Sequence, residues 1–451
     1  MHPGIGHGRI AFRMLGSGRR SRMNAAESRK SRLRDVGILL LLVMLHLGIV
    51  ASVAFDERPL IWPLHNDTIH RAGRGADFYA VYHAAMNLRL GRGPYSDRPD
   101  GVTPYWYPFR YLPVVAIMFQ PFTRLPPTMA YLAWLIITEL ILAALIVVLW
   151  RCFPPGRRRL FAAGALLLSS PYFLELYMGQ FTFVTIALCY LGLLLPWGAA
   201  LFSLSAVLKI FSLATVPALV IQPRYRLHVL LTFAILAAVS IPHFVNYPGQ
   251  WQYFLNVNFR PEGGLHSGNY GLARLLHLLR KDLGLQITPD EWLNWTGTFR
   301  WMVLATTAGL VLLSRQSSPL VGASALLLAH FVTYQHIWEH HLSGVVAIGA
   351  VLLLSGSRKL EPALTMSMLA LALPTLFGVF DTAKDPSVFD PSVSWPSWAS
   401  YLVVLPKVVA TIALYAISIS LLFQDGLQLP RAMLGKITAQ PSARGHSAAH
   451  N

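Results

Sequence analysis

Apolar runs close to 20 residues long recur along nearly the whole chain, and they constrain its fold more than any other feature. A helix of that length crosses the hydrocarbon layer of a membrane. Of the 451 residues, 54% are hydrophobic and only 13% are charged, whereas soluble domains carry about 25% charged residues. Backbone amides inside lipid must be paired within their own segment, which favours helices, and the alternating pattern of barrel strands is not seen. The sequence therefore predicts an all-α, polytopic transmembrane helical bundle.

Charge distribution divides the chain into three parts. The net charge of +17 comes largely from the N-terminal region and from short loops, which is the pattern of cytoplasmic segments in membrane proteins and not of nucleic-acid binding. We expect residues 1–36 to form a basic, disordered cytoplasmic tail, residues 37–423 the membrane domain, and residues 424–451 a second disordered cytoplasmic tail.

The two cysteines, Cys152 and Cys189, have neither the spacing of a disulfide framework nor that of a metal site.

The positions of the arginines also predict a topology of about 10–12 membrane segments. An outer loop over 56–110 follows the first helix, and a second covers 246–297. The proline-marked stretch 111–127 is too short for a full span and predicts a half-helix or interfacial segment. Lys209 stands inside the apolar run 199–222, where a lysine is costly in lipid, so we expect two half-helices broken near it. The remaining spans are predicted at 37–55, 128–150, 160–177, 181–196, 227–245, 298–314, 319–335, 342–355, 362–380 and 398–423.

This topology gathers the unusual polar residues on the outer face. Asp77, Lys209 and the HIWEHH segment at 336–341 all fall there, two of them in or beside apolar segments. A carboxylate can accept the proton of an attacking hydroxyl, and cationic or imidazole groups can meet a departing lipid phosphate. Longer outer loops would by themselves hold more polar residues, and Asp77 could equally be a solvated or helix-capping residue. The pattern favours a site open to the outer leaflet, and these groups would suit the transfer of a sugar from a lipid phosphate if such a donor binds there.

The first outer loop resembles that of glycosyltransferase family 87, a GT-C family of membrane enzymes that use polyprenyl-phosphate-mannose. The resemblance covers about residues 40–355. It rests on Asp77-Phe78, Tyr82-His83, Gly91, Pro94-Tyr95, Tyr107-Pro108 and Pro113, with Gly179-Gln180, the break at Lys209, Asn269 and His340-His341 following in order. Phe109, Ile210 and His83 depart from the family pattern, which weakens the inference of sugar identity.

The resemblance implies an inverting transfer of mannose to a hydroxyl on the extracytoplasmic side of a bacterial plasma membrane, with Asp77 as general base. The candidate ligands of the donor phosphate are Lys209, His336, His340, His341, Arg260 and Arg274. The candidates for sugar or acceptor binding are Tyr82, His83, Tyr107, Gln180 and Asn269. The partners expected are the bilayer, a polyprenyl-phosphate sugar and a glycan or glycolipid acceptor. No metal or other cofactor is expected, since protein cations can meet the phosphate.

Several alternatives remain open at this point. A lipid or glycolipid flippase would share a broken helix and an outer cavity, but should show repeated halves, and none is evident. A membrane scaffold would not need a carboxylate and cations to converge. The histidines could be structural or could bind zinc, although the segment lacks the HExxH arrangement. Lys209 could reach toward an interface, and other hexose or pentose donors are possible.

Overall fold

The computed structural model describes residues 11–56, 59–61, 73–96, 108–259, 266–314, 318–380 and 390–423. All regular structure within these ranges is helical, so the all-α prediction is confirmed. Six helices there are long and apolar enough to cross a membrane: Leu33–Phe55, Pro127–Cys152, Arg157–Met178, Pro223–Asn246, Asn294–Leu313 and Ser397–Phe423. Shorter apolar helices lie between them: Thr182–Leu194, Ala199–Leu208, Ile210–Val220, Pro319–Thr333 and Glu339–Ser355. The protein is a multi-pass membrane protein.

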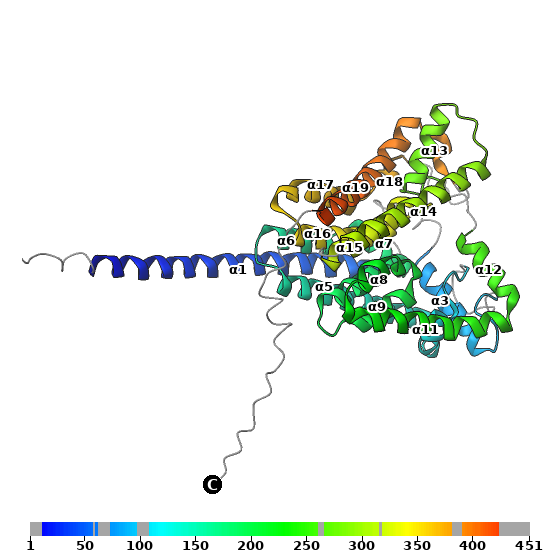
Figure 1. The fold of residues 1–451 in the computed structure, drawn as a ribbon, viewed down its shortest axis with the longest axis horizontal. Helices are drawn as coiled ribbons and strands as arrows, with labels where there is room; N and C mark the ends of the chain where they lie inside the picture. Colours follow the sequence, from blue (N-terminus) through cyan, green and yellow to red (C-terminus); the bar gives the residue numbers. More distant parts are fainter. Residues whose placement is uncertain are drawn as a thin grey trace, which may run out of the picture.

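Helix α1 extends over Ala11–Phe55, although we expected residues 1–36 to lack structure. The stretch from residue 11 has no proline and is rich in arginine, a good helix former, so no helix-breaking proline stops the membrane helix from continuing. Figure 1 shows α1 projecting from one end of the helical body, whereas the labels of α3, α12 and α13 lie at the opposite end. The predicted outer-loop segments are therefore gathered at one end of the bundle.

Two apolar segments are broken inside the bundle. The predicted span 160–177 is in fact α6 (Arg157–Leu167) followed by α7 (Ser170–Met178), because Pro171 lacks the amide that would continue the helix. The run 199–222 divides into α9 (Ala199–Leu208), the 3-10 turn η3 (Ile210–Thr215) and α10 (Val216–Val220). Lys209 lies between them with extended backbone angles, φ −143° and ψ 119°. The predicted break at Lys209 is confirmed.

The outer segments form short helices. The first outer loop contains α3 (Ala76–Arg89), and the stretch predicted as a half-helix is α4 (Pro113–Phe119) with η2 (Gln120–Arg124). The second outer loop contains α12 (Pro248–Phe259) and α13 (Leu272–Asp282) and ends earlier than expected, because α14 begins at Pro289. A capping box between Thr288 and Glu291 fixes that start.

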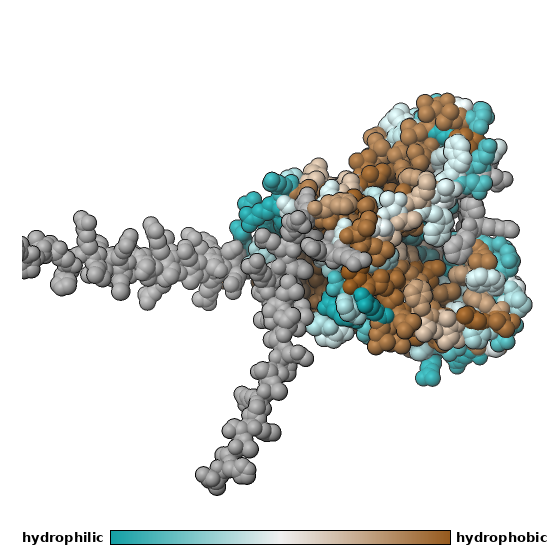
Figure 2. Space-filling model, in the orientation of Figure 1, coloured by the Kyte–Doolittle hydropathy of each residue, from teal (hydrophilic) through white to brown (hydrophobic). Residues whose placement is uncertain are grey.

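The most deeply buried helices stand at the centre of the bundle. Every residue of α8 (Thr182–Leu194) is buried, as are all of α15 (Pro319–Thr333) except Pro319 and nearly all of α16 (Leu342–Ser355). Around them, α5 (Pro127–Cys152), α11 (Pro223–Asn246), α14 (Pro289–Leu313) and α19 (Ser397–Phe423) expose large apolar side chains. Figure 2 shows the resulting apolar surface over much of the visible face, as a protein surrounded by lipid requires.

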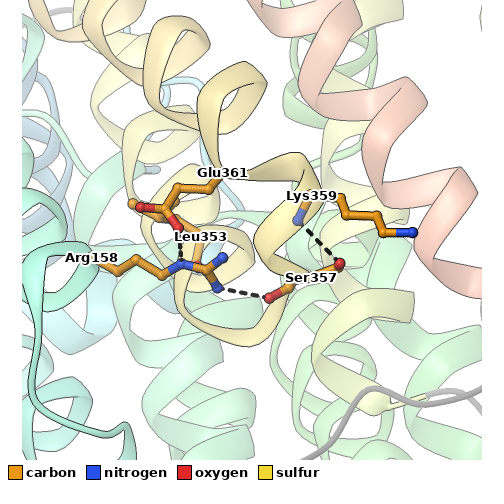
Figure 3. A network of polar contacts seen from close by, with 6 residues as sticks. Arg158, Leu353, Ser357, Lys359 and Glu361 are labelled. Atoms are coloured by element: carbon orange, nitrogen blue, oxygen red, sulfur yellow. Dashed lines mark hydrogen bonds and ion pairs between the residues drawn. The ribbon is translucent and has the colours of Figure 1, made fainter.

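An ion pair joins α6 to the start of α17 at the end of the bundle away from α3. Arg158 of α6 donates from Nε to Glu361 at 2.7 Å and from Nη1 to the carbonyl oxygen of Gly356 at 2.9 Å (Figure 3). Glu361 begins α17 (Glu361–Ala372), so these contacts fasten α6 to the turn between α16 and α17. Both side chains are partly exposed, so the pair orients the turn more than it stabilises the fold.

Candidate active site

The first turn of α3 is docked against the last turn of α7. The amide of Gly75 donates to the carbonyl oxygen of Tyr177 at 2.8 Å. Gly179 ends α7 with φ +66°, a left-handed conformation that glycine adopts without strain. A β-carbon on Gly179 would lie 2.5 Å from Cβ of Phe78, so the two backbones meet more closely than any side chain there allows. Asp77 precedes Phe78, and Gln180 follows Gly179. This contact therefore sets the position of Asp77 relative to Gln180.

Asp77, Gln180 and His340 form a continuous polar contact. Nε2 of Gln180 donates to Oδ2 of Asp77 at 3.1 Å and lies 3.3 Å from Nε2 of His340. The amide oxygen of Gln180 accepts from the backbone N–H of Phe181 at 2.8 Å and from the hydroxyl of Tyr111 at 3.2 Å. Those two donors orient the amide with its NH₂ toward Asp77. Residues 77, 180 and 340 are thus brought together as the sequence predicted.

Lys209 completes this polar cluster from the broken segment. Its ammonium donates to Oγ1 of Thr182 at 2.8 Å, and its charge acts on the carboxylates of Asp77 and Glu175. Two carboxylates near enough to act on the lysine offset part of the cost of its charge, so it can remain in the bundle without reaching toward an interface. The alternative of a snorkelling Lys209 is therefore disfavoured.

Glu175 is a site residue that the sequence analysis missed. Its side chain is fully buried, and Oε1 accepts from the backbone N–H of Phe183 at 2.6 Å. Oε2 accepts from the hydroxyl of Ser343, three residues after His340. Glu175 therefore ties the α7–α8 junction to the first turn of α16, which directly follows the histidine segment. A glutamate within the apolar stretch SPYFLELYM was the signal that could have identified it.

The surroundings of Asp77 tune its acidity. Burial raises the pKa of Asp77 from 3.8 to about 6, against the opposing influence of Lys209, Arg110 and the hydrogen bond from Gln180. A carboxylate with this pKa is largely ionised at neutral pH, and it is a stronger base than an ordinary aspartate. The site therefore holds a carboxylate suited to accept a proton.

The histidine segment is folded back on itself around Trp338. Nε2 of His336 lies 2.8 Å from Nε2 of His266, and the rings of both pack against Trp338. Nδ1 of His341 accepts from the backbone N–H of Trp338 at 3.2 Å. Burial, together with the neighbouring His266 and Arg110, lowers the pKa of His336 to about 3, so that imidazole is neutral at physiological pH. Of the three predicted histidines, His340 is the one that contacts Gln180, which in turn donates to Asp77.

Other predicted residues are engaged elsewhere. The hydroxyl of Tyr82 donates to the carbonyl oxygen of Leu125 at 2.9 Å, and the adjacent His83 is buried on α3. The amide of Asn269 bridges its own loop to Gln335 and Ile337. Arg274 donates to Oγ of Ser392 at 2.7 Å. Their proposed substrate contacts stay predictions, and Arg260 and Tyr107 lie outside the described residues.

Metal-ligating side chains do not converge in the described part of the chain. No group of three or more histidine, cysteine, aspartate or glutamate side chains there has the spacing of a metal site. The pair formed by His266 and His336 is joined by a direct contact between its two Nε2 atoms. Metal independence of the protein remains a prediction.

Comparison with known proteins places the chain in a family. Among solved structures it is similar to the crystal structure of ArnT from Cupriavidus metallidurans in the apo state, with 16% sequence identity and a TM-score of 0.40 over 86% of this chain and 76% of that one. No curated protein matches the chain. The profile of glycosyltransferase family 87 matches residues 109–336, which include Gln180, Lys209 and His336 and exclude Asp77 and His340. That match covers half of the sequence, and the chain belongs to glycosyltransferase family 87.

Proposed function

We propose that the protein transfers a hexose, most simply mannose, from a polyprenyl-phosphate donor to a hydroxyl of a glycan or glycolipid acceptor. The transfer proceeds with inversion at the outer face of a bacterial plasma membrane. Family membership supports the glycosyl transfer. The observation that carries the proposal further is the contact of Asp77 with Gln180, within the electrostatic reach of Lys209.

The reaction follows from the chemistry of these groups. The acceptor oxygen attacks the anomeric carbon, the bond from that carbon to the phosphate oxygen breaks, and polyprenyl phosphate leaves. Asp77 takes the proton of the acceptor hydroxyl, while Gln180 holds the carboxylate in place. Lys209 balances the charge that grows on the leaving phosphate. One carboxylate suffices for one displacement, which agrees with inversion.

The proposed base predicts an acid limb in the pH profile. Asp77 must be ionised to accept a proton, and its pKa is raised to about 6. We therefore expect kcat/KM for a fixed donor to fall as the pH drops through about 6, and to lie well below its neutral value at pH 5. Radiolabel transfer from pH 4.5 to 8 in nanodiscs measures this. A profile that stays flat down to pH 4.5 would contradict the assignment.

The activity itself is tested with purified protein in nanodiscs. We expect turnover with polyprenyl-phosphate-mannose and a mannoside acceptor, continued turnover in EDTA, and weaker or no turnover with polyprenyl-phosphate glucose, galactose or arabinose. Preference for another of these donors would change the sugar and keep the reaction. Failure with every polyprenyl-phosphate donor, accompanied by lipid scrambling, would refute the proposal in favour of a flippase. Loss of turnover in EDTA would refute metal independence.

A further inference from the structure

A second cation, Arg300, stands in a candidate membrane span and has no carboxylate partner among the described residues. Arg300 belongs to α14, within the candidate span Asn294–Leu313. Its guanidinium carbon lies 5.2 Å from the ring centroid of Tyr334, and its Nε is buried without a hydrogen-bond partner. In the described part of the chain no aspartate or glutamate pairs with it. A half-buried guanidinium with no carboxylate beside it among the described residues is costly in a membrane span, so Arg300 is a candidate for binding an anion.

Arg300 lies on the side of α14 that faces the histidine segment. Thr296, one turn earlier on the same helix face, accepts from Nε2 of Gln335 at 2.7 Å. Trp295 and Trp301 are exposed on the outside of the bundle. The helix therefore points Arg300 toward the loop that leads from Tyr334 to His340.

A stack of rings connects Arg300 to Lys209. The ring of His330 is stacked between Tyr334, at 5.1 Å, and Phe211, at 5.0 Å. Phe211 stands two residues after Lys209, so the stack leads from Arg300 to the broken segment that carries Lys209. It links two cations that come from segments far apart in sequence.

We propose that Arg300 and Lys209 together bind the phosphate of the lipid-linked donor. This inference rests on the proposed function. It adds Arg300 to the phosphate-binding residues that the sequence analysis named. A guanidinium stays charged at any physiological pH and can make two parallel hydrogen bonds to a phosphate. The donor phosphodiester carries one negative charge and the released monoester acquires a second, so a fixed cation favours the leaving group as it departs. Arg274, which already donates to Ser392, is a weaker candidate for this role.

The test compares Arg300→Gln with Arg224→Gln. Arg224 makes the same kind of contact, its guanidinium carbon 4.6 Å from the ring centroid of Tyr225, but it stands at the start of α11 and belongs to no proposed site. The readouts are the thermal stabilisation of nanodisc-embedded protein by polyprenyl phosphate, with neutral polyprenol as reference, and the KM for the donor. We expect Arg300→Gln to lose the phosphate-dependent stabilisation and to raise KM by about 10–100-fold, the range expected when a charge-assisted contact with the phosphate is lost. Arg224→Gln should match wild type.

The outcomes separate the inference from the proposed function. If wild type gains no more stability from polyprenyl phosphate than from polyprenol, the proposed function itself is contradicted. If wild type does and Arg300→Gln binds polyprenyl phosphate as tightly, the role of Arg300 is refuted and the function stands. Arg300→Lys keeps the charge without the planar fork, so it should bind with intermediate affinity. If Arg300→Gln does not fold, the affinity of Arg300→Lys for polyprenyl phosphate is the test. Wild-type affinity in Arg300→Lys would refute bidentate binding.

Discussion

Replacing Asp77 with asparagine will remove most of the turnover and leave the fold intact. Asparagine has nearly the same shape and cannot take up the acceptor proton, and proton transfer by a positioned base contributes about 10²–10⁴-fold to rate. Its amide oxygen can still accept from Nε2 of Gln180, which now donates at 3.1 Å. We therefore expect kcat to fall by about 10²–10⁴-fold with little change in donor affinity. Single-turnover transfer and donor binding in nanodiscs measure the two effects separately.

The thermal stability of Asp77→Asn distinguishes a catalytic from a structural role. The folded-state pKa is raised, so the folded protein binds the proton more tightly than the unfolded chain, and ionisation at neutral pH costs stability. Removing the charge should leave Tm unchanged or higher. Asp282→Asn is the matched control, because Asp282 also accepts one hydrogen bond, from Tyr401, but lies on the surface. Equal turnover of Asp77→Asn and Asp282→Asn would eliminate Asp77 as the base.

The sequence predicted the parts of the site whose residues are out of place in lipid. Lys209 inside an apolar run predicted the break that the structure contains. Asp77, Gln180 and His340 were predicted to converge because the topology placed them at one end of the bundle, and they are in contact. Charge and apolar length are strong signals in membrane proteins, since each misplaced polar group costs several kcal/mol. Large features of the fold follow from them.

The rest could not be predicted because residue type does not determine the direction of a side chain. Tyr82 lies on the same short helix as Asp77, yet its hydroxyl is bonded to Leu125. Asn269 uses both ends of its amide to close a loop. Arg300 was not distinguished from other arginines near span ends, because tertiary packing decides that none of the described carboxylates pairs with it. Periodicity identifies helices, and the packing between them decides which residues share a site.

The contact between Gly179 and Phe78 makes the position of Asp77 sensitive to a single methyl group. Gly179→Ala places a side chain at φ +66°, which costs about 1–2 kcal/mol, and sets its Cβ 2.5 Å from Cβ of Phe78. Because that atom is bonded directly to the backbone of α3, relief requires the helix itself to move, and Asp77 is the preceding residue. A displacement of about 1 Å can cost 10²-fold in rate. We expect kcat to fall by about that factor, measured by single-turnover transfer.

Gly91→Ala separates the steric effect from the backbone effect. Gly91 also has a left-handed conformation, φ +71°, but a β-carbon there would meet no atom within 4 Å. Gly91→Ala should therefore lower Tm only by the amount that the left-handed backbone costs, a cost that Gly179→Ala also has. Its kcat should stay near the wild-type value. If both variants lose activity equally, the left-handed backbone strain that they share and not the position of the carboxylate limits turnover. If Gly179→Ala retains full activity, the close approach of α7 and α3 does not set the geometry of the base.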